Sequence, residues 1–378
     1  MLPTARVESA PRMISYEYPN CISCHVSVQG RGLLNAYGRG IDLAQSYSQL
    51  DYTGLILGRA DRSKQTNETW DGRFGNVLMD FVFTARLNQQ RNPEKTDPTL
   101  FGLYRQTIFA GEKDQCRLNT EIGFRDSGLN DLPLGPHLTA TGGGTVFVRK
   151  FLFEWRLDDN GTSGQEIAIG RDYLPLGLQI DDETAFILHL NHNGVYDFPL
   201  QFKYFVWNEK WLTSAFIYAP SFEERSDSRE YGGGILYERY LSRNLALGVQ
   251  GLAAFGEAAE RLKMGAHVRW GISSNWALLG QVDYSRFRNV ASSEVQGDQI
   301  TAYLQLFYHH YEWLVSSVTV NYAYSDLLAA DDHLYSVRYS INARLNRNFS
   351  VGLGYATGDI ERTLQYAQQA SVFATIKF

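Results

Sequence analysis

The strongest constraint on the fold is an alternation of apolar and polar residues that recurs from Phe74 to the end of the chain. The segment 334–345 shows it most clearly, because every second residue there is apolar or aromatic. That set is Tyr335, Val337, Tyr339, Ile341, Ala343 and Leu345, and the intervening set is Ser336, Arg338, Ser340, Asn342 and Arg344. Successive side chains of a β-strand point to opposite faces, so the pattern predicts strands with one apolar and one polar face.

The region divides into about 16 strand-length segments, at 74–90, 101–110, 115–126, 145–157, 165–171, 198–207, 211–219, 231–240, 245–255, 261–272, 276–287, 299–310, 313–325, 334–345, 349–357 and 367–378. A count of roughly 14 to 18 also fits, particularly if 184–197 forms an extra hairpin or a loop tucked into the pore. Tight connections such as 208–210 and 311–312 tend to alternate with longer ones such as 91–100, 172–197 and 220–230. Short turns at one rim and long loops at the other are typical of outer-membrane barrels.

A soluble β-sandwich also alternates, so alternation alone leaves a dry core and a lipid-facing surface as alternatives. Aromatic residues are plentiful, with 23 Tyr and 21 Phe against 10 Pro, which favours strands. No apolar run approaches the roughly 18 residues that a transmembrane helix needs. The chain ends with Ala370, Val372, Ala374, Ile376 and Phe378 on one phase, which resembles the C-terminal strand of bacterial outer-membrane proteins. We therefore expect an all-β fold, with a transmembrane antiparallel β-barrel over residues 74–378.

Residues 21–25 read Cys21-Ile22-Ser23-Cys24-His25, which is the c-type haem attachment sequence Cys-x-x-Cys-His. In this sequence the two thiols form thioethers to one haem, and the histidine supplies an axial nitrogen to the iron. Because the chain has only 3 Cys and 8 His, a chance match is on the order of one in a thousand. We expect one covalent c-type haem in an N-terminal segment, residues 1–73, with a short helix near 33–47. Whether this segment plugs the barrel stays open.

Other interpretations of the cysteine pair are a redox active site, half of a zinc site and a structural disulfide. A thioredoxin-like active site needs a βαβ setting, which the strand pattern does not provide. A tetrahedral zinc site needs a fourth ligand, and no second cysteine pair is present to complete it. The sequence therefore favours haem.

The sequence leaves the second axial ligand of the iron open. Met13 lies close to the motif, and two histidines fall in the long connection 172–197, which would have to fold inwards. For any single histidine of this kind a solvated polar role is commoner than ligation. The candidates for the distal position are Met13, His189, His192, His267 and His309.

Attachment of c-type haem takes place outside the cytoplasmic membrane, so the motif and the barrel predict the same compartment, the bacterial outer membrane. An even strand count puts both termini on the periplasmic side. Residues 1–10 hold no apolar signal core, so we expect the signal peptide to be absent from this chain. The formal charge is -6 and the chain has no basic stripe, so nucleic acid is not an expected partner. The predicted barrel would be surrounded by outer-membrane lipid.

A Cys-x-x-Cys-His segment joined to a porin-like barrel resembles the monohaem cytochrome–porin fusions of the bacterial outer membrane, some of which oxidise ferrous iron outside the cell. The resemblance is one of architecture over the whole chain, and the residues specific to the family are Cys21, Cys24 and His25. The sequence departs from the iron-oxidising group around the motif, where 17–20 read Glu-Tyr-Pro-Asn and 26–32 read Val-Ser-Val-Gln-Gly-Arg-Gly. The departure leaves the electron donor open.

The resemblance implies electron transfer across the outer membrane through the haem, rather than an enzyme with a bound small-molecule substrate. Its expected partners are periplasmic or extracellular cytochromes and an external donor or acceptor, with iron or another metal among them. The alternative is an outer-membrane anchor or assembly barrel for a multihaem cytochrome complex or filament. A diffusion porin with an incidental haem is the third hypothesis.

Overall fold

The computed structural model describes residues 11–17, 25, 34, 45, 73, 74, 76–91, 94–111, 114–125, 145–159, 163–178, 199–220, 230–256, 259–289, 295–326, 333–346, 348–359 and 366–377. Its elements in chain order are η1 (Pro11–Tyr16), β1 (Arg73–Phe74), β2 (Val77–Arg91), β3 (Glu94–Ala110), β4 (Cys116–Arg125), β5 (Thr145–Asp159), β6 (Gly164–Arg171), β7 (Leu200–Asn208), β8 (Trp211–Ala219), β9 (Glu230–Ser242), β10 (Leu245–Gly256), β11 (Ala259–Gly271), β12 (Trp276–Asn289), β13 (Val295–Tyr311), β14 (Leu314–Ser325), β15 (His333–Asn346), β16 (Phe349–Asp359) and β17 (Tyr366–Lys377).

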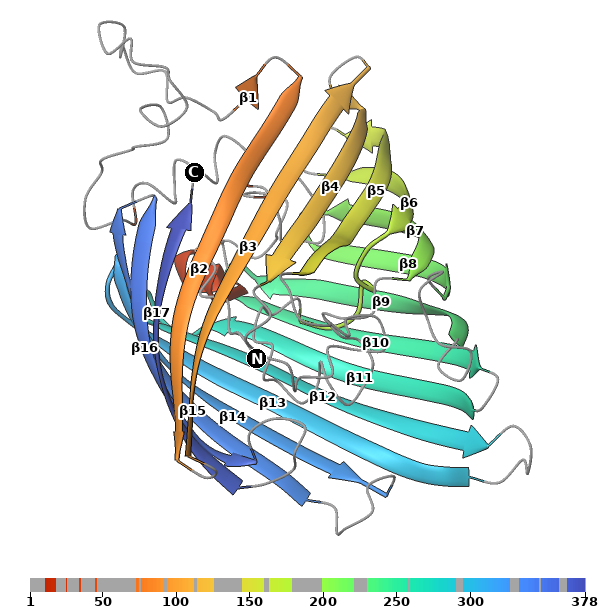
Figure 1. The fold of residues 1–378 in the computed structure, drawn as a ribbon. Coiled ribbons are helices and arrows are strands. Elements are labelled where there is room, and N and C mark those ends of the chain that lie inside the picture. The colour runs from red at the N-terminus through yellow and green to blue at the C-terminus, as the bar shows by residue number, and fades with distance from the viewer. Residues whose placement is uncertain are drawn as a thin grey trace, which may run out of the picture.

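The strands β2 to β17 form one closed antiparallel barrel of 16 strands. Each strand pairs with its neighbours in sequence, and β17 closes the ring on β2 through pairs that run from Gln369↔Gln90 to Lys377↔Val82. The two-residue β1 adds a short pairing to β2. Figure 1 shows the strands tilted around the barrel, with η1 inside the wall. The predicted fold class and strand count are confirmed.

The alternation in the sequence is the inside–outside alternation of the barrel wall. On β11, Leu262 and Met264 are about half exposed on the outer face, whereas Lys263 and His267 are 1% and 4% exposed and face the interior. The predicted phase of β15 is confirmed in the same way, with Tyr335, Val337 and Tyr339 outside and Ser336 and Arg338 inside. Along most strands the outward phase carries large apolar side chains that remain exposed, and an outer surface of this kind belongs in lipid.

One rim of the barrel carries tight turns. There β7 and β8 are joined by residues 209–210, β9 and β10 by residues 243–244, and β13 and β14 by residues 312–313. This end, called the short-turn rim below, also holds the start of β2 and the end of β17. The opposite end, the long-loop rim, carries the connections 172–199 and 220–229. The predicted difference between the two rims is therefore present.

One predicted long loop is wrong. The expected connection over 91–100 is reduced to residues 92–93, because β2 and β3 continue to pair from Leu87↔Pro98 to Arg91↔Glu94. The added part of β3, residues 94–100, reads Glu-Lys-Thr-Asp-Pro-Thr-Leu, in which every residue before Leu100 except the proline is polar. A strand that leaves the apolar band has no apolar phase, so alternation cannot reveal it.

Tryptophans mark the membrane interface at the short-turn rim. Four of them lie near strand ends on this side, on the outward phase, namely Trp155, Trp211, Trp270 and Trp276, and Trp313 lies in the turn between β13 and β14. Tryptophan is enriched where a membrane meets water, because its ring is apolar while its N–H prefers a polar partner. These tryptophans indicate the level of the short-turn rim relative to the bilayer.

Most of the N-terminal region lies outside the described residues, so a separate domain over 1–73 stays a prediction. The short helix expected near 33–47 is not found at the two positions described there. Leu34 forms an isolated antiparallel bridge with His25, and Gln45 lies in a turn. No helix in the described ranges is long and apolar enough to cross a bilayer.

Candidate functional site

The interior of the barrel is closely filled. Charged side chains that face inward are buried, and Lys203 and Asp283 are 0% exposed while Arg105 and Arg117 are 2% exposed. In a wide water-filled channel such side chains are solvated by the channel water. Their burial indicates an interior occupied by protein. Two described segments contribute to the filling, namely η1 and residues 172–178, here called the crossbar.

The turn η1 packs its apolar side chain against the barrel wall. Ile14 is fully buried in a cluster with side chains that face inward from β7 to β10, namely Phe205, Trp207, Leu212, Leu236, Tyr240 and Ala246. Further contacts of η1 are made to β11 and β12. Burial of one isoleucine side chain stabilises a contact by about 1.5–3 kcal/mol. The cluster therefore binds η1 at a defined place on the wall.

Polar contacts hold η1 from the other side. The Tyr16 hydroxyl lies 3.2 Å from Nδ1 of His309 on β13, and its ring meets the imidazole edge-on. Ser15 Oγ lies 3.5 Å from Nε2 of the same ring. At the end of the turn, Glu17 lies 3.4 Å from Arg243, in the β9–β10 turn. These contacts place η1 at the short-turn end of the interior.

The crossbar follows β6 and runs through the interior, with all seven residues buried. Leu174 and Leu176 pack against Phe216 and Tyr218 of β8 and against Leu252 and Ala254 of β10. Tyr173 and Leu178 pack against residues of β12, β13 and β14, namely Ala277, Leu279, Tyr303, Phe307 and Val315. Apolar side chains of a loop thus cover apolar side chains of the wall, which water would otherwise meet.

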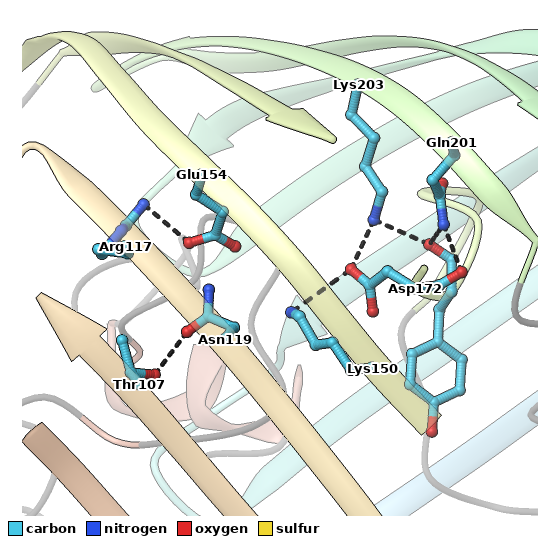
Figure 2. Close-up of polar contacts among 9 residues, drawn as sticks. Thr107, Arg117, Asn119, Lys150, Glu154, Asp172, Gln201 and Lys203 are labelled. Atoms are coloured by element: carbon cyan, nitrogen blue, oxygen red, sulfur yellow. Dashed lines mark hydrogen bonds and ion pairs between the residues drawn. The ribbon is translucent and has the colours of Figure 1, made fainter. Parts of the chain in front are cut away.

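The base of the crossbar is held by a group of buried charges (Figure 2). Asp172 accepts a hydrogen bond from Lys203 Nζ at 2.6 Å, and Lys150 Nζ lies 3.4 Å from the same carboxylate oxygen. Lys203 also donates to the carbonyl of Tyr173 at 3.0 Å, and Gln201 donates to the carbonyls of Asp172 and Tyr173. Side chains of β5 and β7 therefore fix the point at which the chain enters the interior.

The tip of the crossbar is held on the opposite side. Leu178 donates its backbone N–H to Oε1 of Gln281 on β12 at 2.7 Å. Gly177 has a φ of 60°, and a Cβ atom there would lie 2.4 to 2.7 Å from the amide atoms of Gln281. Only glycine combines this backbone conformation with so close an approach. The crossbar is thus fixed at both ends across the interior.

The inner face of the wall carries ion pairs between strands that are adjacent or next but one in the sheet. Arg117 lies 3.1 Å from Glu154 on the next strand (Figure 2). Beside this pair, Thr107 donates a hydrogen bond to Asn119 at 2.5 Å. Further pairs join Arg105 to Asp80, Arg117 to Glu166, Arg261 to Glu230, Lys263 to Asp283, and both His267 and Arg269 to Glu238. Such pairs contribute little net stability, but breaking one leaves a buried charge and is costly. Within the described ranges, no group of three or more His, Cys, Asp or Glu is arranged to hold a metal ion.

The predicted haem-attachment residues are only partly within the described structure. Cys21 and Cys24 lie outside the described residues, as do the distal candidates His189 and His192. His25 is described, and its side chain is 1% exposed. An imidazole that ligates the iron of an enclosed haem must be buried in this way. The roles of Cys21, Cys24 and His25 stay predictions.

The other distal candidates all have contacts of their own. Met13 is buried next to Ile14, and its sulfur lies 3.8 Å from the amide nitrogen of Gln45. His267 Nε2 lies 2.9 Å from Glu238, and His309 contacts Ser15 and Tyr16 of η1. Ligation by either histidine through the same nitrogen would break these contacts. Their assignment as ligands also stays a prediction.

The sequence analysis left open that the connection 172–197 folds inwards, but it did not single out residues 172–178 or the site that holds η1. A signal for the crossbar is present, because residues 173–178 read Tyr-Leu-Pro-Leu-Gly-Leu directly after a strand. Three leucines and a tyrosine are unusual in a loop that faces solvent, since loops run over the surface and are commonly polar. No comparable signal marks His309, whose contacts with Ser15 and Tyr16 join parts of the chain that are far apart in the sequence.

No protein-family model matches the chain, and no curated protein matches its sequence. Solved structures do match its fold. OmpT of Vibrio cholerae, an outer membrane protein in its in-vitro folded trimer form, has 10% identity and a TM-score of 0.59, over 80% of this chain and 99% of that chain. OmpF of Salmonella typhi in complex with daunomycin has 11% identity and a TM-score of 0.58, over 80% and 97% of the two chains.

The outer membrane channel DcaP of Acinetobacter baumannii gives a similar result, with 10% identity and a TM-score of 0.56 over 80% of this chain and 97% of that chain. At such low identity the likeness is one of fold, and it carries no function with it. Strand number, closure and outward apolar phase agree with the comparison. The chain folds as a porin-like outer-membrane β-barrel of 16 strands.

Proposed function

We propose that this protein transfers electrons across the bacterial outer membrane through one c-type haem, bound covalently at Cys21 and Cys24 with His25 as an axial ligand. The observation that carries the proposal is the burial of His25, the one described residue of the attachment motif, in a chain whose preceding turn is docked inside the barrel. A histidine of a solvated, unstructured leader would have no reason to be buried. His25 thus belongs to a packed part of the molecule.

The docked turn limits where the haem lies. Cys21 follows Glu17 by four residues, and an extended chain advances at most about 3.6 Å per residue, so the two are within roughly 14 Å of each other. Glu17 contacts Arg243 at the short-turn rim. We therefore place the haem at the short-turn end of the barrel, which we assign to the periplasmic side, where a periplasmic cytochrome can reach it.

The residues present fit a c-type haem. The motif supplies two thiols and an imidazole in the required order, and η1 brings the chain to a wall with aromatic side chains at Phe205, Trp207 and Tyr240. When bound, the haem supplies an iron centre that accepts and releases one electron. The two thiols and the His25 imidazole would hold it, and η1 would fix the chain that carries them to the barrel wall.

The filled interior argues against a diffusion porin. A hydrophilic solute needs an aqueous path lined by solvated side chains, whereas the crossbar and η1 cover the inner wall over β7 to β14. The charged residues of the remaining wall, such as Arg86 and Arg105, are buried as well. Electrons need no aqueous path. A closed barrel with a redox centre is consistent with electron transfer and prevents leakage of solutes.

The second candidate function is an anchor or assembly barrel for a multihaem cytochrome complex or filament, in which the haem is the contact to the next haem. The filled interior favours this function equally, because an anchor also needs no pore. The two proposals differ in the partner. An external metal, iron among them, is the donor or acceptor in the first, and a stable cytochrome complex is the partner in the second.

The test begins with the haem content. One haem per chain that survives acid–acetone extraction and shows a pyridine haemochrome spectrum is expected, and a haem removed by the extraction would contradict covalent attachment. The variant His25→Ala should assemble as a barrel, judged by heat-modifiable gel mobility, yet lose whole-cell electron exchange with an external metal or electrode. The matched control is His310→Ala, which removes an exposed histidine on β13 and should change neither. Undiminished exchange in an assembled His25→Ala barrel would refute the electron-transfer role.

A further inference from the structure

Gly271, the last residue of β11, lies directly against η1. A Cβ atom at this position would stand 2.6 Å from the carbonyl oxygen of Ile14 and 2.7 and 2.8 Å from Cα and N of Ser15. All three are backbone atoms, so no side-chain rotation can relieve the overlap. Any residue other than glycine at position 271 therefore forces η1 and β11 apart.

The barrel side of this contact is fixed. Gly271 donates its N–H to the carbonyl of Asn244 at 2.7 Å, and it accepts a hydrogen bond from the side chain of Asn244 at 2.8 Å. Both bonds come from the turn between β9 and β10. Because β11 is held in this way, an added methyl group at Gly271 moves η1 rather than the strand.

A second rigid point faces η1 from β13. His309 contacts Ser15 and Tyr16 through its two ring nitrogens. Its own backbone is bound to Asn275, with the His309 N–H donating to the Asn275 carbonyl at 2.8 Å and the Asn275 side chain donating to the His309 carbonyl at 2.8 Å. The strand ends on both sides of η1 are thus tied to short turns.

We propose that Gly271 and His309 are positioning residues for the haem segment. Together with the apolar cluster around Ile14 they form one site, the η1 seat, that accepts η1 in a single register. One buried apolar position and two hydroxyl contacts define that register, since a shift by one residue would put Ser15 into the apolar cluster. Through η1 the seat positions His25, eight residues beyond Glu17. The inference rests on the proposed function because it assumes the haem. Its first experiment, however, can be done whether or not the protein carries haem.

The first experiment uses hydrogen exchange of the whole protein in detergent or nanodiscs. In Gly271→Ala, backbone amides of residues 13–17 and of His25 should both exchange roughly tenfold faster or more, because local opening exposes the segment. The matched control is Gly251→Ala on β10, where an added Cβ meets only the Lys263 carbonyl, at an ordinary 3.8 Å. It should exchange like the parent protein.

Two results would overturn the inference. If residues 13–17 loosen while His25 keeps its protection, the seat holds η1 without positioning the motif. If neither changes in a folded Gly271→Ala barrel, the seat does not hold η1. A second variant, His309→Phe, retains an aromatic ring beside Tyr16 but removes both nitrogen contacts, and it should loosen the same two regions. It tests the seat without adding a methyl group to the β11 contact.

The haem gives an independent readout. In preparations that carry it, Gly271→Ala should shift the haem absorption spectrum or midpoint potential while the haem stays covalently attached, and Gly251→Ala should not. An unchanged spectrum and potential together with faster exchange at residues 13–17 would overturn the positioning role. A protein without haem would refute the proposed function, and the exchange experiment would still decide whether the seat positions His25.

Discussion

The backbone N–H of Leu178 donates a 2.7 Å hydrogen bond to Gln281, a residue 103 positions further along the chain on β12. Gln281 in turn donates its amide N–H to Asp283 at 2.7 Å, so the carboxylate fixes the orientation of the amide. The carbonyl oxygen of the amide is thereby directed at the crossbar. One glutamine links the interior segment to the charged groups of the wall.

The first prediction concerns this link. The variant Gln281→Leu leaves the buried N–H of Leu178 without its acceptor, which should cost about 1–3 kcal/mol of local stability. Hydrogen exchange of residues 172–178 should become faster by a corresponding factor. The matched control is Gln250→Leu, because Gln250 also donates to Asp283, at 2.6 Å, but has no hydrogen bond to the crossbar residues 172–178. Equal exchange of the crossbar in both variants would show that the loss at Asp283, and not the link to Leu178, is responsible.

The second prediction concerns the base of the crossbar. The variant Asp172→Asn removes the carboxylate that lies between Lys150 and the fully buried Lys203, and it should destabilise the protein by about 3–5 kcal/mol. The variant Lys150→Met keeps the Asp172–Lys203 pair at 2.6 Å and should cost clearly less. Urea-induced unfolding from phospholipid vesicles measures both. An equal or reversed order would contradict the assigned role of Asp172.

The third prediction concerns conductance. The protein in a planar bilayer should conduct small ions far more weakly than an open porin, because its interior is filled. Replacing 173–178 by a glycine–serine stretch of the same length should raise the conductance, since that stretch cannot cover the apolar wall residues and leaves the interior open. A conductance of the parent protein as high as that of an open pore would contradict the filled interior and support a diffusion porin.

The fourth prediction concerns the outer face. Tyr339 points outward near the middle of β15, and Tyr339→Arg should cost roughly 2–4 kcal/mol because it places a charge in lipid. The control Ser340→Arg introduces the same side chain at the next residue, on the inner face, and should cost less. Folding into bilayers followed by urea titration gives both values. Equal costs would reject the assigned phase of β15.

The barrel could be predicted because contact with lipid requires every second residue of a membrane-spanning strand to be apolar. A strand such as β15 must present Tyr335, Val337 and Tyr339 to lipid, so its outward phase is apolar and easily recognised. The inner phase has no such uniformity. On β7, Lys203 and Trp207 both face inward. The inward position of apolar residues such as Trp207 is explained only by their packing against Ile14 of η1.

The site was less accessible to sequence analysis for a related reason. Cys21, Cys24 and His25 lie within five residues of one another, as the c-type haem attachment sequence requires, and this contiguity makes the motif recognisable. The η1 seat joins Ile14 and Ser15 to Gly271 and His309, which are more than 250 positions away. The closed barrel brings these residues together, and the sequence around Gly271 does not predict that η1 packs against this glycine.

The contacts of the crossbar have a consequence for the order in which the barrel is assembled. Its apolar side chains touch β8, β10 and β12 to β14, whereas the ring is sealed by β17 on β2. The crossbar leaves the wall after β6 and contacts strands that follow it in sequence. It can therefore pack in place before β17 pairs with β2. Closure then traps it, and it does not have to be threaded through a finished cylinder. Variants that weaken its two attachment points should accordingly slow the last step of barrel formation more than the pairing of the first strands.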